Sequence, residues 1–540
     1  MSERLWIYPL IAVAAYIALS VYVLWTGHPH EDAYILYIFS ENFAAGEGIS
    51  YFKGGPPAEG ATDFLWMIAL GVLTYAGIDV ALAATILNGV GVGILVFALS
   101  LFLPLRQLGN RLSHVIMLGV AVIVILSPIT EASLAGFSTG LYSGIIALFL
   151  YIIYRNNDNL NLLIPFIGLV LGLFRPDGVI IGVSGALVGL LNSYKNEGLN
   201  VYLKSSAICF VLGCFYFFWR YNYFGSLLPL PLYVKGSSSD LLPGLASHFK
   251  WVGQSAFLVI MAMLAIFLSN NRRNIVLMIT PVLLLFFFLS FATLSQNVSY
   301  RLQAPGTVAV LVLATLFVSY CLASKSKNKK LSVVMLGLYV FSILQYLDDT
   351  VDYVHYAQGG AYINSFPFYL KDYASSSTVS GLTEAGRFAY WLPGEKYDLV
   401  GLNTKKTAIE GASPQYISKL DPDLLFMHHA GTAEFSNVCN NKKWCQITSE
   451  ELFSSIEAEK AGVWDEYNYG VKRAPLAIFD FLGSSKNRFD YYVMYYEGGF
   501  NHFYALKKSG EIENFQFEKA LSKSFQDKNG RSYLDLKNAF

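Results

Sequence analysis

The sequence predicts a polytopic α-helical membrane protein with about 11 transmembrane helices and a C-terminal extracytoplasmic domain of α/β or α+β type. Composition is the first reason, because only 14% of the 540 residues are charged and 54% are hydrophobic, whereas a soluble globular chain carries about 25% charged residues. The second is a series of apolar runs in residues 1–349, each near the length of a bilayer-spanning helix. The third is a change to polar, mixed-charge sequence at about residue 350.

The first apolar run follows a basic N-terminal start and covers residues 6–25. A secretory signal has a shorter apolar core and a small-residue cleavage site. Neither is evident, so we expect a retained first span. The segment 64–77 is apolar but short, which predicts an interfacial or re-entrant helix within a first outer loop over residues 26–80. The predicted spans are 6–25, 81–103, 113–129, 140–154, 160–174, 178–194, 202–219, 251–269, 275–293, 302–322 and 331–347.

Basic residues set the orientation of these helices. With the N-terminus inside, the basic clusters fall in cytoplasmic loops, as the positive-inside rule requires, and the odd number of spans delivers the chain to the outer side. We therefore expect a transmembrane domain over 1–349 and a soluble outer domain over 350–540, with strand-like runs at 423–429, 476–482 and 491–496. The cytoplasmic cations are Arg106, Arg111, Arg155, Lys195, Arg272, Arg273 and those of 324–330.

The 38 basic residues of the chain equal its 38 acidic ones, so net charge favours neither nucleic acid nor a polyanionic partner. Local placement is more informative, because two adjacent acids follow the first span in His28-Pro29-His30-Glu31-Asp32. Acids at the end of a span are costly and tend to mark function. A carboxylate there can accept a proton from an attacking hydroxyl or hold a divalent cation such as Mg, Mn or Ca. The histidines can assist either role or simply cap the interface.

Several cations are predicted on the same outer face as the two acids. Arginine matches the oxygens of a phosphate or pyrophosphate, so this grouping predicts an anionic ligand near the membrane surface. Local alternatives stay open, since Arg175-Pro176-Asp177-Gly178 can form a simple turn and Arg220 or Lys235 can anchor a helix end. The cations in question are Arg175, Arg220, Lys235 and Arg301.

The five cysteines fall into two classes. Cys209, Cys214 and Cys321 lie in apolar runs and are expected to pack as small hydrophobic side chains. Cys439 and Cys445 flank the polar loop CNNKKWC, which lacks the further ligands that a zinc site needs. If this loop lies outside the cytoplasm, we expect a disulfide between the two.

The first outer loop resembles a family pattern. It contains Glu31-Asp32-Ala33-Tyr34-Ile35, then Gly46-Glu47-Gly48, and then Glu59-Gly60-Ala61-Thr62-Asp63-Phe64-Leu65-Trp66. This order is similar to that of the GT-C superfamily of polyprenyl-phosphate-dependent membrane glycosyltransferases. In the bacterial branch that contains mycobacterial terminal arabinofuranosyltransferases, the loop reads roughly D-D-A-Y-I, G-x-G and E-G-x-T-N-F-L-W.

Later motifs extend the resemblance to about residue 430, with departures. Arg175 to Gly178 looks like R-P-[DE]-G, Arg220 to Lys235 like R-x-x-Y-[YF]-G…P-N-T-x-x-x-K, and Arg301 to Pro305 like R-[FL]-x-x-P. In the outer domain, Glu384-Ala385-Gly386 is similar to D-x-G. The departures are Glu31 for the first Asp, Leu230 for the Asn of P-N-T, Ser295-Gln296-Asn297 for Gly-Gly-Asp, and Gly136-Phe137-Ser138-Thr139 for Gly-[LM]-Glu-Thr, which removes an acid.

The resemblance implies an inverting glycosyltransferase (EC 2.4 class) of the bacterial inner membrane, with a role in cell envelope biogenesis. It would transfer a sugar, arabinofuranose in the branch named above, from a polyprenyl-phosphate donor to a glycan, lipid or protein acceptor. The implied base is Asp32 or Glu31, the same two residues that could bind a cation. The implied substrate-binding residues are Arg175, Asp177, Arg220, Tyr223, Lys235, Arg301, Glu59 and His30.

Other functions fit parts of the same sequence. A transporter or flippase of a lipid-linked anion could use the same cations without chemistry, and a non-catalytic scaffold could display the outer domain. Within the enzyme class, hexose, aminoarabinose and protein-mannosylating specificities compete with arabinofuranose. The tryptophans of the outer domain either bind acceptor glycan or pack in its core; they are Trp391, Trp444 and Trp464.

Overall fold

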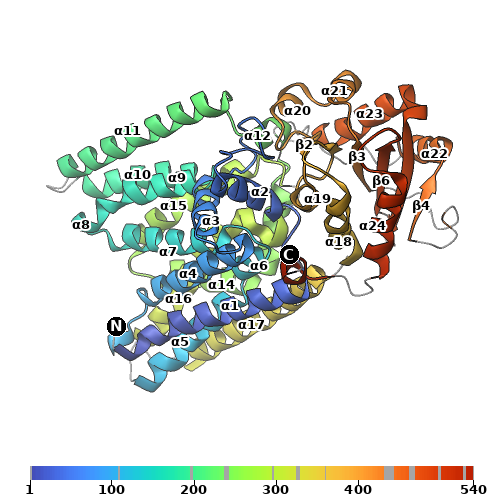
Figure 1. The fold of residues 1–540 in the computed structure, drawn as a ribbon. Helices are drawn as coiled ribbons and strands as arrows, with labels where there is room; N and C mark the ends of the chain where they lie inside the picture. Colours follow the sequence, from blue (N-terminus) through green and yellow to red (C-terminus); the bar gives the residue numbers. More distant parts are fainter. Residues whose placement is uncertain are drawn as a thin grey trace.

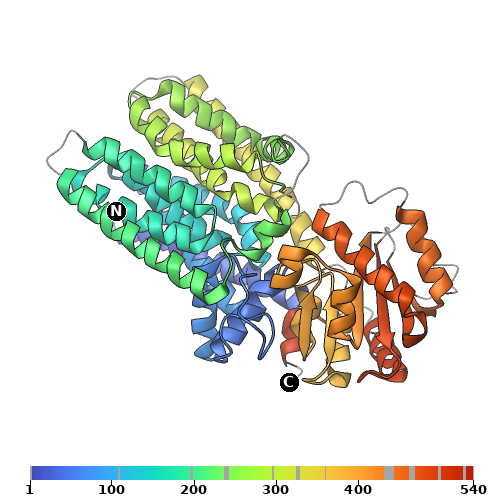
Figure 2. The ribbon, with the colours of Figure 1, turned by 90° about the horizontal axis from the view of Figure 1, so that it is seen from above.

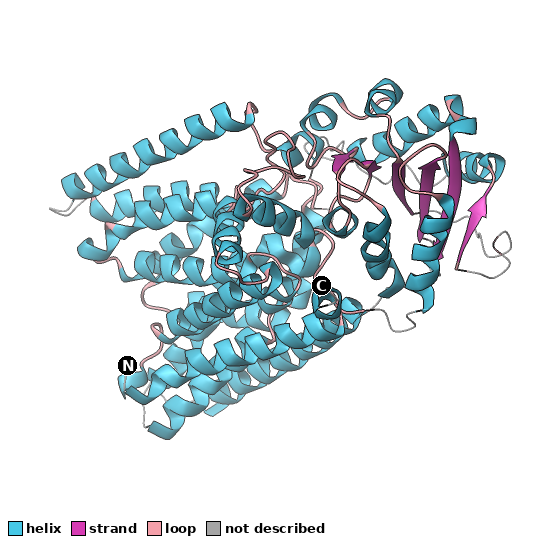
Figure 3. Ribbon diagram, in the orientation of Figure 1, coloured by secondary structure: helices cyan, strands magenta, loops and turns pink. Residues whose placement is uncertain are grey.

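The computed structural model places a large helical part beside a smaller part built on a β-sheet (Figures 1 and 3). Seen from above, the sheet-containing part lies at one end of the helical bundle (Figure 2). The structure describes residues 3–538 except 108–109, 195–198, 236–241, 295–296, 324–328, 359–360, 431–438, 440–442, 461–468, 497–499 and 527–530.

The described helices of the first part follow the predicted apolar runs closely. Most are joined by short connections, and the long segment between α1 and α4 contains α2 and α3. They are η1 (Glu3–Trp6), α1 (Ile7–Thr26), α2 (Ala33–Ala44), α3 (Phe64–Tyr75), α4 (Val80–Ser100), η2 (Leu105–Gln107), α5 (Asn110–Ile125), α6 (Pro128–Leu134), α7 (Thr139–Arg155), α8 (Asp158–Asn161), α9 (Leu163–Phe174), α10 (Gly178–Ser193), α11 (Leu199–Phe224), α12 (Leu230–Lys235), α13 (Leu245–Gln254), α14 (Ala256–Leu268), α15 (Arg272–Leu289), η3 (Val298–Gln303), α16 (Ala304–Ala323) and α17 (Lys329–Gln358).

The number of helices that can cross a membrane is smaller by length than the predicted 11. Within the described residues, six helices are long and apolar enough, or up to eight if each bent pair is one span. The bent pairs are α5 with α6, at 49°, and α13 with α14, at 89°. The predicted spans 140–154, 160–174 and 178–194 are apolar helices of at most 17 residues, about 25 Å at 1.5 Å per residue. As predicted, 64–77 forms a short helix, α3.

The outer surface of the helical part carries large apolar side chains. On α11, Ile208, Phe210, Phe215 and Phe218 are between 61% and 73% exposed. Exposed apolar surface of this extent is costly in water and marks contact with lipid or another apolar partner. This exposed apolar surface and the length of the apolar helices together indicate a multi-pass membrane protein.

Inside the bundle, small residues let helices approach closely. At Gly91 of α4, an added Cβ would lie 2.2 Å from the Cα of Leu141 on α7, and at Gly144 it would lie 2.5 Å from the carbonyl oxygen of Gly91. Such contacts are typical of helix packing in membranes, where dispersion forces replace the hydrophobic effect. The same packing joins α9 to α10 through Gly168 and Gly182.

The C-terminal part is a mixed six-stranded sheet with the order β2-β1-β3-β6-β5-β4. Strands β2, β1 and β3 are parallel, and β3, β6, β5 and β4 pair antiparallel. The strands are β1 (Val379–Leu382), β2 (Glu395–Asp398), β3 (Leu424–Ala430), β4 (Trp444–Ile447), β5 (Phe489–Tyr496) and β6 (Phe500–Lys507). The helices are α18 (Ala361–Leu370), η4 (Lys371–Tyr373), α19 (Arg387–Trp391), α20 (Lys405–Glu410), α21 (Pro414–Leu420), α22 (Ser449–Lys460), α23 (Tyr469–Ser484), η6 (Lys486–Arg488), α24 (Asn514–Gln526) and α25 (Tyr533–Asn538).

Two of the three predicted strand runs are confirmed, as β3 and β5, and the third is wrong. Residues 476–482 belong to helix α23. The buried apolar side chains there are Ala474, Ala477, Ile478, Phe479, Phe481 and Leu482. Their recurrence at intervals of three and four residues gives a helix one broad apolar face, which leaves Asp480 exposed.

Hydrogen bonds attach the C-terminal part to the two loops that precede and follow α2. Gly386 N donates to the carboxylate of Glu31, Arg387 Nη2 donates to the carbonyl of Pro29 at 2.8 Å, and Tyr51 Oη donates to the carbonyl of Ala385 at 2.5 Å. Helix α25 returns to pack on α1. Helix α17 runs through residue 349, where the sequence predicted the domain boundary.

Candidate active site

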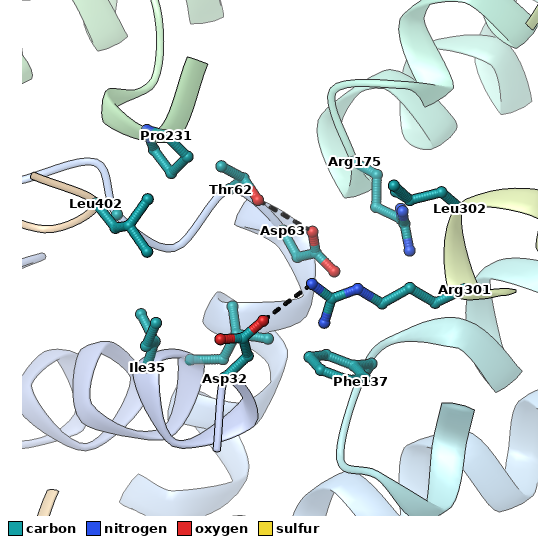
Figure 4. A pocket seen from close by; sticks show the side chains of 12 residues that line it. Asp32, Ile35, Thr62, Asp63, Phe137, Arg175, Pro231, Arg301, Leu302 and Leu402 are labelled. Carbon is teal, nitrogen blue, oxygen red and sulfur yellow. Dashed lines mark hydrogen bonds and ion pairs between the residues drawn. The ribbon is translucent and has the colours of Figure 1, made fainter. Parts of the chain in front are cut away.

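A pocket of about 140 Å³ lies where the loop before α3, the start of α2 and η3 meet (Figure 4). Two acids and two arginines face it, and apolar side chains close its walls. The lining residues are Asp32, Ile35, Leu36, Gly60, Thr62, Asp63, Phe137, Arg175, Pro231, Arg301, Leu302 and Leu402. Only Leu402 comes from the C-terminal part of the chain.

Asp32 immediately precedes helix α2, so the helix start positions its side chain. Its Oδ2 accepts a hydrogen bond from Arg301 Nη2 at 3.2 Å. The side chains of Asp32 and Arg301 are 12% and 17% exposed, respectively. The pair therefore lies at the pocket wall, sheltered but open to a ligand.

Arg301 follows an unusual backbone turn in η3. Ser299 and Tyr300 have φ values of 47° and 52°, a left-handed conformation that costs non-glycine residues free energy and gathers at functional sites. The guanidinium carbon of Arg301 lies 3.8 Å from the ring centroid of Phe137, a cation–π contact. The turn and the ring together fix the direction of the guanidinium.

Arg175 is the second cation of the pocket. It ends helix α9 and is 5% exposed. Its Nε donates to Asp177 Oδ1 at 2.9 Å, and its guanidinium lies 5.1 Å from the ring centroid of Tyr142. Asp177 thus holds Arg175 in place and does not line the pocket itself.

Asp63 is a pocket residue that the sequence interpretation did not select. It immediately precedes helix α3, and Figure 4 shows its carboxylate directed toward Arg175 and Arg301. Ser138 Oγ donates to Asp63 Oδ2 at 2.5 Å, and Thr62 Oγ1 lies 3.4 Å from Asp63 Oδ1. The sequence signal that could have identified Asp63 is its place in the motif from Glu59 to Trp66.

Glu31 points away from this pocket, although it adjoins Asp32 in sequence. Its Oε1 accepts from Gly386 N, and an added Cβ at Gly386 would lie 2.0 Å from the Glu31 carbonyl oxygen. Burial raises the pKa of Glu31 well above its usual range, and the carboxylates of Glu384 and Asp32 raise it further. Glu31 therefore joins the two parts of the protein.

The histidines before Glu31 are held by local contacts. His30 Nδ1 accepts from Asp32 N at 3.2 Å, and His28 Nε2 lies 2.8 Å from the carbonyl oxygen of Arg531. Burial lowers the pKa of His30 to about 4 and that of His28 to about 3. Both rings are therefore neutral at pH 7. His30 shapes the turn that presents Asp32.

Glu59 and Arg220, both predicted to bind substrate, form an ion pair with each other. Arg220 Nε donates to Glu59 Oε1 at 2.6 Å, and Arg220 Nη2 donates to Glu59 Oε2. The residues are 7% and 5% exposed, respectively. This pair connects α11 to the loop before α3, outside the lining of the pocket.

Tyr223 and Lys235 also lie outside the lining. Tyr223 Oη accepts from Ile49 N at 3.1 Å and lies 2.8 Å from a Cβ built on Gly48, whose φ is 76°. Tyr223 thus supports the Gly-Glu-Gly turn. Lys235 is the last residue of α12, and the structure does not describe its side chain.

A divalent cation was one of the roles left open for Glu31 and Asp32. Their carboxylates have different partners, Gly386 N and Arg301, and among the described residues no three His, Cys, Asp or Glu side chains are grouped to hold a metal ion. The oxygen ligands that Mg²⁺ or Ca²⁺ needs are not assembled around Glu31 and Asp32 by the described side chains.

A larger cavity of about 410 Å³ lies between the loop of residues 51–58 and the C-terminal part. Gly60 with Leu402 and Asn403 separates it from the Asp32 pocket, because an added Cβ at Gly60 would lie 1.9 Å from Asn403 Oδ1. Its lining includes Tyr51, Phe52, Tyr397, Tyr416, Lys406 and Glu410.

Of the tryptophans considered for acceptor binding, Trp391 and Trp444 do not line that cavity. Trp391 is 7% exposed and packs in the core, whereas Trp444 lies on β4. Trp464 lies outside the described residues. Cys439 and Cys445 form a disulfide.

No protein-family model matches this chain, and no curated protein matches its sequence. Among solved structures, the crystal structure of ArnT from Cupriavidus metallidurans in the apo state is similar, with a TM-score of 0.51 at 13% sequence identity. The similarity covers 81% of this chain and 96% of that one. The chain therefore has a fold similar to that of ArnT, and in this chain a helical part precedes a small mixed sheet.

Proposed function

We propose that this protein is a glycosyltransferase that moves a sugar from a polyprenyl-phosphate donor to a glycan, lipid or protein acceptor at the outer face of the membrane. The observation that carries the proposal is the pairing of Asp32 with Arg301 in a pocket that Arg175 also lines. The ArnT-like fold supports it, since ArnT is a GT-C aminoarabinose transferase. A bacterial inner membrane location, with the C-terminal part outside, belongs to the same proposal.

The proposed reaction is an inverting displacement. The acceptor oxygen forms a bond to the anomeric carbon, while the bond from that carbon to the phosphate oxygen breaks and its electron pair stays with the polyprenyl phosphate. The acceptor proton passes to Asp32, a carboxylate at the pocket wall. General-base assistance of this kind contributes about 10²–10⁴-fold.

Arg301 and Arg175 supply the positive charge for the leaving phosphate. Both guanidiniums are fixed before any ligand binds, Arg301 by Phe137 and Asp32 and Arg175 by Asp177. Preorganised charge of this kind stabilises the transition state because no reorganisation is needed as charge develops. Glu31 acts indirectly, by holding the segment that carries Asp32 against Gly386.

The acceptor is proposed to enter through the cavity lined by Tyr51, Phe52, Tyr397 and Tyr416. At about 410 Å³, on the junction of two parts of the chain, it matches ordinary ligand sites in size and place. Tyrosine and phenylalanine rings suit the apolar faces of a sugar, and Lys406 with Glu410 offers polar partners for hydroxyl groups. Gly60 and Leu402 line the Asp32 pocket, and Asn403, which contacts Gly60, lines this cavity, so the two are neighbours.

The identity of the sugar is the finer part of the proposal. The motifs of the loop between α1 and α4 favour arabinofuranose, whereas the structural similarity to ArnT is compatible with aminoarabinose. A panel of polyprenyl-phosphate sugars (pentofuranose, aminoarabinose and hexose), supplied to the purified protein in nanodiscs, tests the function. We expect release of polyprenyl phosphate with one donor class and none with the Asp32→Asn variant.

A transport function is the outcome that would replace this proposal. If no donor is turned over, the same protein in liposomes should be tested for movement of a fluorescent polyprenyl-phosphate sugar between leaflets. If the lipid-linked sugar moves between leaflets and no donor is turned over, the arginines would be assigned to transport.

A further inference from the structure

Asp63 lines the pocket, and its Oδ2 accepts a hydrogen bond of 2.5 Å from Ser138 Oγ, which lies outside the lining. Ser138 is fully buried and immediately precedes helix α7, whereas Asp63 immediately precedes helix α3. Two helix starts, 75 residues apart, thus fix one carboxylate.

This carboxylate lies between the two cations of the pocket. Figure 4 shows it directed toward Arg175 and Arg301, on the far side of Arg301 from Asp32, and it interacts electrostatically with both guanidiniums. Arg301 therefore has one acid on each side. The ion pair of Arg301 is with Asp32, so Asp63 acts on the orientation of Arg301 through its charge, from across the pocket.

Position 138 is one of the departures given above, and position 63 also differs from the resembled pattern. Position 63 is Asn in the resembled pattern and Asp here, and position 138 is Glu in the pattern and Ser here. The carboxylate that is absent at position 138 is thus present at position 63, across a hydrogen bond.

We propose that Asp63 is a positioning residue for Arg301 and Arg175, and that Asp63 and Ser138 act as one unit whose carboxylate can be carried by either position. This inference rests on the proposed function, because it assigns the two arginines to the donor phosphate. Asp63 orients them for the leaving group. It also competes with the phosphate for them before the reaction.

Relocating the carboxylate tests the unit. Asp63→Asn keeps the shape of the side chain and removes its charge, and the exchange Asp63→Ser with Ser138→Asp moves the charge while conserving total side-chain volume. We expect kcat to fall about 10²-fold in Asp63→Asn and in Asp63→Ser, as for other preorganised electrostatic groups. The kcat of the exchange variant should be at least tenfold higher than that of Asp63→Ser.

Phosphate binding gives a readout that needs no turnover. Affinity for polyprenyl phosphate alone, measured by native mass spectrometry in detergent, should rise several-fold in Asp63→Asn, because the arginines lose a competing anion. The melting temperature should stay within a few degrees of the wild-type value. A purely structural role would instead lower the melting temperature and weaken phosphate binding together.

The outcomes separate the two proposals. If the wild type turns over no donor while Asp63→Asn binds polyprenyl phosphate more tightly, the glycosyltransferase assignment fails and the positioning role stands. If the wild type is active and the exchange variant is no better than Asp63→Ser, the shared-carboxylate unit is overturned. Weaker phosphate binding in Asp63→Asn overturns the positioning role.

Discussion

Arg301 and Asp32, which lie 269 residues apart in the chain, meet at 3.2 Å on the wall of the pocket. This contact brings the segment after the first span to the start of the last predicted spans. It also separates Asp32 from Glu31, since the neighbouring Glu31 accepts a hydrogen bond from Gly386 in the C-terminal part.

The first prediction concerns the two acids. Asp32→Asn should reduce kcat by about 10²–10⁴-fold, because the acceptor loses its base, with no change in melting temperature. Glu31→Gln keeps a hydrogen-bond acceptor for Gly386 N and should cost less than tenfold. The double variant should be inactive but expressed. Equal losses in the two single variants would contradict the assignment of Asp32 as the base.

The second prediction concerns the buried ion pair of Arg220 with Glu59. Removing one partner leaves an unpaired buried charge, so Arg220→Met and Glu59→Gln should each destabilise the protein. The free energy of unfolding should fall by at most about 3–5 kcal/mol in each variant. The measurement is the melting temperature in detergent. Arg301→Met is the comparison variant, since it should abolish transfer but cost less stability than Arg220→Met, because the Arg301–Asp32 pair is more exposed than the Arg220–Glu59 pair. A stable, inactive Arg220→Met would place Arg220 in substrate binding instead.

The third prediction concerns pH. The pKa values of His28 and His30 are lowered by burial to about 3 and about 4 in the folded protein, from about 6.5 when unfolded. Between pH 6.5 and pH 4, the unfolded state therefore binds protons that the folded state does not, and stability falls as the pH falls. The melting temperature should drop over this range, and a His28→Gln, His30→Gln variant should show a flatter profile. Glu31, whose pKa is raised, contributes with the opposite sign in both proteins.

The fourth prediction concerns the disulfide between Cys439 and Cys445. Disulfides persist on the oxidising side of a membrane, so peptide mass spectrometry of native membranes, alkylated during lysis, should find these two cysteines joined. Cys439→Ser with Cys445→Ser should cost about 2 kcal/mol of stability, the loop-closure value for a short loop. Free thiols at both positions in native membranes would contradict an outer location for this part of the chain.

The fifth prediction concerns the aromatic cavity. Tyr397→Ala should raise KM for the acceptor about tenfold, because a stacking face is lost, and leave KM for the donor unchanged. Tyr320→Ala serves as a control, since Tyr320 lies on α16, away from this cavity. An unchanged acceptor KM would remove the cavity from the acceptor path.

The sequence by itself determined the class of the protein and most of its helices. Apolar length and low charge require a membrane environment, and these quantities depend on local composition alone. The predicted strands at 423–429 and 491–496 also followed from local pattern. The error at 476–482 arose because a short apolar run suits a strand or a buried helix equally well, and the helix formed where the apolar spacing continued over Ala474 to Leu482.

The tertiary structure decided how the charged residues were divided among their roles. Arg220 and Arg301 look alike in sequence, yet one is neutralised by Glu59 and the other lies open to a pocket beside Asp32. Asp63 lines the site and is held there by Ser138, which lies 75 residues away and immediately precedes α7. The physical reason is that an ion pair depends on distance in space, which the spacing of residues along the chain does not contain.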